Sequence, residues 1–105
     1  MTADDPELLR ARLNLETGRL DWPALARHFA RGVVIKVAPG MDLVAVAAAL
    51  GRDDKAAVEG WLAEGRIARA SDADAQAWHA GRATFWAVVV APWVLVQEDG
   101  AGLSR

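Results

Sequence analysis

The chain has 105 residues, of which 53% are hydrophobic and 25% are charged, and its net charge is −2. This composition is typical of one globular domain with a real core, and it excludes an intrinsically disordered chain and a polybasic one. The sequence contains no cysteine, which excludes disulfides and thiolate metal sites and suits the cytoplasm.

The N-terminal residues and the longest apolar run indicate where the protein resides. The first ten residues, MTADDPELLR, begin with acids and lack the basic and then apolar layout of a secretory signal. The run FWAVVVAPWVLV (85–96) is too short to span a bilayer as a helix. We therefore expect a soluble, cytoplasmic protein with one domain over 1–105, ordered over about 5–98 and ending in a flexible tail at 99–105.

The first half of the chain predicts three helices and one strand. A helix should begin at Asp5-Pro6 and end at Gly18, and a second should run over 21–32. The β-branched segment VVIKVA (33–38) predicts a strand, and a third helix should follow over 42–51. The residues that should face the core in the second and third helices are Trp22, Leu25, Ala26, Phe29, Leu43, Val46, Ala47 and Leu50.

The second half predicts two more helices and two strands. A helix capped by Asp53 should end at Gly65, with Val58, Trp61 and Leu62 as its core stripe, and RIARA (66–70) should form a short strand. Ser71 and Asp74 resemble a capping box that opens a helix to Gly81. The segment TFWAVVVAPWVLVQE (84–98) predicts one long strand, broken or bent at Pro92.

These elements predict an α+β fold. From the second helix on, their order is that of a winged helix, helix-strand-helix-helix-strand-helix-strand, with an extra helix at the N-terminus. The helix at 71–81 would then lie in the wing between the last two strands. Such a scaffold indicates a fold and not a function.

Two segments also resemble a known family. LRARLNLETGRLDWPALARHFARG and the later WAVVVAPWVLVQ are similar to a family of short bacterial proteins known only as a domain of unknown function. The resemblance covers about residues 8–97. It implies a bacterial, cytoplasmic protein, and it implies no activity, cofactor or catalytic residue.

The helix that would read DNA in a winged helix has the wrong charge for that role. Its exposed positions offer one lysine, Lys55, against four carboxylates, Asp53, Asp54, Glu59 and Glu64. Carboxylates oppose the counterion release that drives binding to phosphates, and no Asn or Gln is present to read a base. We expect no nucleic-acid partner, although a winged-helix regulator stays open as an alternative, and these acids form a face available to a basic protein.

The residues that carry chemistry are few. His28 and His79 share no metal-ligand spacing, and no phosphate loop or nucleophile elbow occurs, so we expect no metal, no cofactor and no enzyme. A second alternative is a small-ligand site or enzyme built on the turn at 14–21 and the basic helix face beside it. Its candidate residues are Asn14, Glu16, Arg19, Arg27, His28 and Arg31.

The last strand is apolar on both faces, whereas an antiparallel strand with one wet face would alternate. One face would thus remain as an apolar patch that monomers rarely leave in water. We therefore predict a homodimer, and more broadly a non-enzymatic protein-interaction and dimerisation module. The residues predicted to carry self-association are Trp86, Val88, Val90, Trp93 and Val94.

Overall fold

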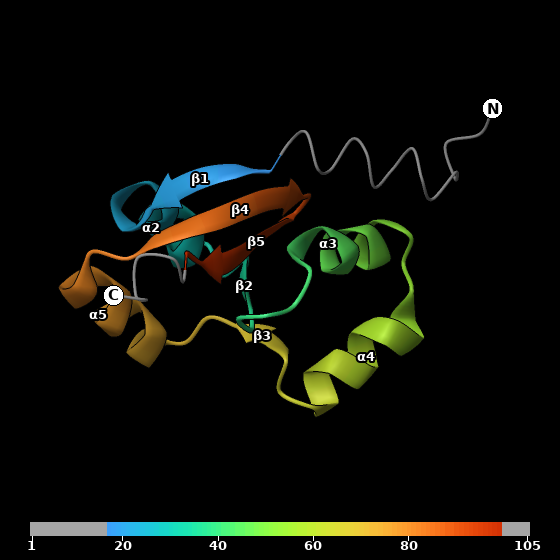
Figure 1. Ribbon diagram of the computed structural model, residues 1–105. Coiled ribbons are helices and arrows are strands. Elements are labelled where there is room, and N and C mark those ends of the chain that lie inside the picture. The colour runs from blue at the N-terminus through green and yellow to red at the C-terminus, as the bar shows by residue number, and fades with distance from the viewer. Residues whose placement is uncertain (1–16, 100–105) are drawn as a thin grey trace.

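The computed structural model describes residues 17–99, which form four helices and one five-stranded sheet (Figure 1). The α+β class predicted from the sequence is therefore confirmed. The helix predicted at 5–18 lies outside the described residues except at its end. There, Gly18 begins a strand. Of the predicted tail at 99–105 only Asp99 is described, and its backbone N–H donates to the carbonyl of Thr84 at 3.0 Å.

The five strands are arranged in the order β1-β4-β5-β2-β3. Neighbouring strands are antiparallel except β2 and β5, which are parallel and place Ile35 opposite Leu95. The parallel pair joins a strand from the first half of the chain to the C-terminal strand β5, which is the middle strand of the sheet. The bounds of the strands are β1 (Gly18–Asp21), β2 (Val34–Val37), β3 (Ile67–Arg69), β4 (Thr84–Val90) and β5 (Trp93–Glu98).

Each helix begins at a polar N-cap whose side chain accepts a backbone N–H three residues later, which satisfies a group that the helix itself leaves unpaired. The helix starts predicted at residues 21, 42 and 71 are confirmed, with Asp21, Asp42 and Ser71 as the caps. The cap of the fourth predicted helix is Asp54 and not Asp53, which instead adopts a positive φ of 58° in the link before it. The bounds of the helices are α2 (Trp22–Ala30), α3 (Leu43–Gly51), α4 (Lys55–Ala63) and α5 (Asp72–Gly81).

Helices cover both faces of the sheet, so the core has two halves (Figure 1). On one face of the sheet α3 packs with Val46 and Ala47 fully buried. The helix α4 packs against α3 and adds partly buried residues to this half of the core. On the other face α2 and α5 enclose Leu25 and Phe85. The predicted core faces of the second and third helices are thus confirmed.

The break predicted at Pro92 in the segment 84–98 is confirmed, but the two halves are separate strands that form a hairpin and not one strand. β4 and β5 pair antiparallel across a turn at Ala91-Pro92, where the peptide bond is cis. Proline cannot donate a hydrogen bond to a sheet, so it lies in the turn. Both strands are interior to the sheet, which is why the whole segment is apolar on both faces.

The winged-helix arrangement is not confirmed. In that arrangement the strand at 66–70 would pair with the last strand to form a wing around the intervening helix. Here β3 pairs only with β2, at the edge of the sheet, and β2 pairs parallel with β5. The sequence matched the order of the elements, but this sheet pairs them differently.

Two smaller predictions also fail. The inter-helix turn expected at 14–22 contains the strand β1, which pairs with β4 from Gly18 to Asp21. Leu62, expected in the core stripe of the fourth helix, is 48% exposed, and no residue of α4 is buried. Val58 and Trp61 are enough to attach this helix to the α3 side of the core.

Within residues 17–99, no helix has the length and apolar character needed to cross a membrane.

Candidate functional site

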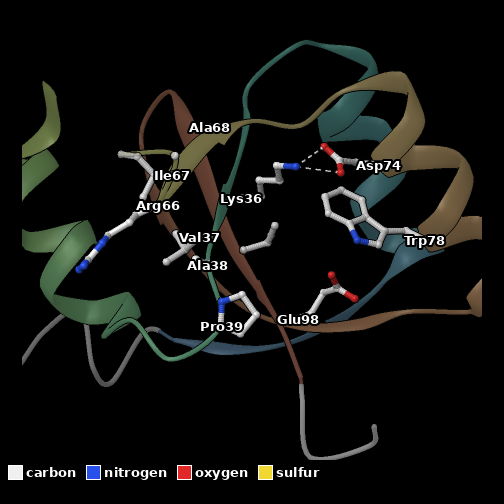
Figure 2. Close-up of a pocket in the computed structure, with 12 residues that line it drawn as sticks. Lys36, Val37, Ala38, Pro39, Arg66, Ile67, Ala68, Asp74, Trp78 and Glu98 are labelled. Carbon is white, nitrogen blue, oxygen red and sulfur yellow. Dashed lines mark hydrogen bonds and ion pairs between the residues drawn. The ribbon is translucent and has the colours of Figure 1, made fainter. Parts of the chain in front are cut away.

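A pocket of about 230 Å³ lies where the ends of β2 and β3 meet the first turns of α5 (Figure 2). It opens on the sheet face that α2 and α5 cover. Two cations and two carboxylates from four separate elements or loops surround it, together with one large aromatic ring. Its lining is Lys36, Val37, Ala38, Pro39, Gly65, Arg66, Ile67, Ala68, Asp74, Trp78, Val96 and Glu98.

An ion pair between Lys36 and Asp74 closes one side of the pocket (Figure 2). Lys36 is the one polar residue of β2, and alternation along the strand turns its side chain toward α5, on the side opposite Ile35 and Val37. Its Nζ atom lies 2.9 Å from each carboxylate oxygen of Asp74. The contact fixes α5 to the centre of the sheet.

Asp74 is held in its ionised form. Burial by itself would raise the pKa of this carboxyl group, but three hydrogen bonds and the charge of Lys36 together lower the pKa below its ordinary value of 3.8. Ser71 donates two of these bonds to Oδ2, from its backbone N–H at 2.9 Å and from its hydroxyl at 3.0 Å. The capping box predicted from Ser71 and Asp74 is thereby confirmed and also serves the pocket.

Trp78 brings an accessible hydrogen-bond donor to the pocket on a ring that is otherwise almost fully buried. Its side chain packs edge-on against Phe85, with ring centroids 4.9 Å apart, and the residue is only 4% exposed. Its indole N–H makes no hydrogen bond within residues 17–99, yet no buried side-chain nitrogen or oxygen of this part of the chain lacks a partner. The indole N–H must therefore reach open space, and Figure 2 shows the indole nitrogen on the side of the ring that faces the pocket.

The remaining two charges differ in how they are compensated. Arg66 is paired, because its Nε lies 3.0 Å from a carboxylate oxygen of Glu64. Glu98, at the end of β5, has no hydrogen-bond or ion-pair partner among the described residues. The pocket thus contains the unpaired carboxylate of Glu98 and the unpaired indole N–H of Trp78, beside the ion pair of Lys36 and Asp74.

The four carboxylates of the acidic face predicted on the fourth helix differ in the structure, because two are paired and two are exposed. Asp54 caps α4 and lies 3.4 Å from Arg52, and Glu64 pairs with Arg66. Asp53 and Glu59 are exposed. Partner binding by this face, and the absence of nucleic-acid binding, stay predictions.

The residues predicted to carry self-association do not form one surface. The hairpin turns Val94 to the side opposite Trp93, and both Val88 and Val94 are buried in the chain's own core. Trp86, Val90 and Trp93 share the α3 face and keep exposed surface, with Trp86 41% exposed. Self-association through all five residues is therefore excluded, and the homodimer itself stays a prediction.

The polar site predicted around residues 14–31 is not assembled by the described residues. Asn14 and Glu16 lie outside them. Arg19 stacks on Trp86 at 4.9 Å and pairs with Asp99, on the face of the sheet opposite α2. The sheet thus separates Arg19 from the side chains of α2 that were expected to join it, Arg27, His28 and Arg31.

Sequence reasoning missed the pocket because its four charged residues are far apart in the chain. Asp74 was predicted only as part of a cap. One local signal was present, since Lys36 interrupts an otherwise β-branched strand that is buried on both faces. Among residues 17–99 no group of three or more His, Cys, Asp or Glu is placed to hold a metal ion.

Comparison with known proteins places the chain in a family. The model of the family described as "Protein of unknown function (DUF2288)" matches residues 8–98. A solved structure, the NMR solution structure of PA1075 from Pseudomonas aeruginosa, is similar with a TM-score of 0.78 and 40% sequence identity, over 94% of this chain and 91% of that chain. No match was found among the curated proteins. The resemblance inferred from the sequence is therefore confirmed, and the chain belongs to the DUF2288 family.

Proposed function

We propose that this protein is a non-enzymatic binding module that takes a small polar ligand in the pocket between β2, β3 and α5. One observation carries the proposal. The indole N–H of Trp78 opens into the pocket without a partner, although the ring that bears it is almost fully buried. A ligand acceptor would replace water at this N–H, and such a hydrogen bond contributes about 0.5–1.5 kcal/mol.

The character of the lining supports binding over catalysis. General acid–base chemistry favours a group whose pKa lies near the working pH. Asp74 is instead held ionised by its pairing with Lys36, and the described lining has no histidine, serine or threonine to act as base or nucleophile. Fixed charges around a rigid hollow are suited to recognition.

Self-association is a second candidate, favoured by the exposure of Trp86. This residue, Val90 and Trp93 lie on the α3 face of the sheet, and Trp86 is outside the core cluster that α3 covers. Large aromatic residues that are partly exposed on one face are enriched in interfaces.

The proposed pocket is tested by ¹H–¹⁵N NMR of the indole groups. Small polar compounds are added class by class: carboxylates, amines, amino acids, sugars and nucleotides. We expect at least one class to shift the Trp78 indole signal in a saturable manner. Trp61, on α4 at the other face of the sheet, is the internal control and should not move. If no class shifts Trp78, or if both signals move together, the proposed function is wrong.

A further inference from the structure

We infer that the ligand of this pocket is a small zwitterion of the α-amino acid class. The inference rests on the proposed function and adds the chemistry of the ligand to it. It follows from counting, among the described residues, which groups of the pocket are already paired and which are free.

When Arg66 is counted as neutralised by Glu64, which lies outside the pocket, the unpaired charge that remains in the lining is negative. Lys36 and Asp74 neutralise each other at 2.9 Å, and Arg66 is neutralised by Glu64 at 3.0 Å. The carboxylate of Glu98 is left without a partner in the described chain, on the same face of β5 as Val96. A ligand that matches this charge carries a cation, and a primary ammonium group is the smallest one that donates several hydrogen bonds.

The free donors of the pocket require an acceptor. The indole N–H of Trp78 has no partner, and the ammonium group of Lys36, which donates one hydrogen bond to Oδ1 of Asp74, has N–H groups left to donate. A carboxylate could accept from Lys36 with charge-assisted strength. Figure 2 shows the indole nitrogen of Trp78 on the Glu98 side of the ring, so its N–H would meet the part of the ligand that lies beside Glu98. Figure 2 shows Lys36 and Glu98 on opposite sides of the Trp78 ring, so the anionic and cationic groups of one ligand would be directed to different walls.

The size and apolar parts of the pocket agree with a compact molecule. Its volume of about 230 Å³ is below the roughly 300–1,000 Å³ of sites that take drug-sized ligands. Pro39, Ala68 and Val96 supply apolar wall between the charged groups. This composition suits a ligand with two opposite charges close together and a short apolar side chain.

The inference is tested by titration with individual amino acids, followed by chemical dissection of the one that binds most tightly. Its N-acetyl derivative lacks the ammonium group, and its amide lacks the carboxylate. We expect each derivative to bind at least about three to ten times more weakly than the free amino acid, because one charge-assisted contact is lost at a partly exposed site. Glu98→Gln should weaken binding of the free amino acid to the same degree and leave the affinity for its N-acetyl derivative unchanged.

Glu59→Gln is the matched control, because it removes an exposed carboxylate from α4 without touching the pocket. Its affinity for the amino acid should equal that of the wild type. If the N-acetyl derivative binds as tightly as the free amino acid, or if Glu98→Gln has no effect, the zwitterion inference is overturned. If amino acids leave the Trp78 signal unchanged while another class shifts it, this inference fails and the proposed function stands.

Discussion

Asp72 and Asp74 both lie in the first turn of α5, where a negative charge interacts favourably with the helix dipole, but only Asp74 also contacts Ser71 and Lys36. Asp74→Asn should therefore lower the free energy of unfolding by about 1 kcal/mol, the size of a lost cap or charge-assisted bond. Asp72→Asn, which loses only the dipole interaction, should change it by less than about 0.5 kcal/mol. Chemical denaturation of the two variants at neutral pH measures the difference, and equal effects would contradict the assigned role.

The pH dependence of the same residue has a definite sign. Because the pKa of Asp74 is lower in the folded chain than its ordinary value of 3.8, the unfolded chain binds the proton first as the pH falls. The stabilisation from the charged Asp74 is therefore full above about pH 4 and is lost as the pH drops through the folded pKa. The stability gap between wild type and Asp74→Asn should shrink over that acidic range. A gap that is constant down to the acid-unfolding region would show that the charge contributes nothing.

At this scale the sequence predicted what is local and missed what is not. The caps at Asp21, Asp42 and Ser71 were found because a cap and the N–H it accepts are three residues apart. Lys36 and Asp74 are 38 residues apart, and their meeting depends on how α5 packs on the sheet. No spacing rule connects two such positions.

The hairpin of β4 and β5 places neighbouring aromatic residues in opposite environments. Phe85 is fully buried among Leu25, Trp78 and other core side chains, whereas Trp86 is 41% exposed on the other face. Phe85→Ala should lower the free energy of unfolding by about 3–5 kcal/mol, because it leaves a cavity in the core. Trp86→Ala should cost only about 1 kcal/mol, mostly the stacking with Arg19. Thermal or urea unfolding of both variants would contradict the assignment of faces if the larger loss came from Trp86.

Among the elements, helices were predicted better than strand pairings. Apolar spacing and caps located α2, α3 and α5, because helical hydrogen bonds are formed within one segment. The strand β1 was missed because GRLD contains one apolar residue and forms only by pairing with β4, more than sixty residues later. The apolar run at 84–98 was visible, but a strand buried on both faces and two adjacent interior strands have the same composition.

For the whole molecule, the homodimer predicted from the sequence stays a prediction, and the exposed residues indicate which face it would use. Trp86, Val90 and Trp93 are the predicted residues that keep exposed surface, and they lie on the α3 side of the sheet. If the chain dimerises there, Trp86→Asp should convert a species of twice 11.2 kDa into a monomer. Val89→Asp is the matched control, since Val89 is 59% exposed on the same strand but on the opposite face. Light scattering that finds the wild type monomeric at high concentration would reject the homodimer.

The family assignment and the α+β class were both accessible from the sequence, whereas the strand topology and the site were not. Resemblance covers nearly the whole chain, and the α+β class follows from the elements. The pocket arises only where β2 runs parallel to β5 and α5 closes over their ends, which brings Lys36, Asp74, Trp78 and Glu98 together. The parallel pairing was the part of the topology that the winged-helix comparison missed.

The most direct test of the account is the hydrogen–deuterium exchange rate of the Trp78 indole N–H in the ligand-free protein. The central claim is that this donor opens into the pocket although its ring is buried. The account predicts exchange far faster than that of the core backbone amides of β5, close to the rate of the exposed Trp86 indole, and slower once a ligand occupies the pocket. Protection of the Trp78 indole as strong as that of the core amides would contradict the account, because the donor would then already be satisfied inside the protein.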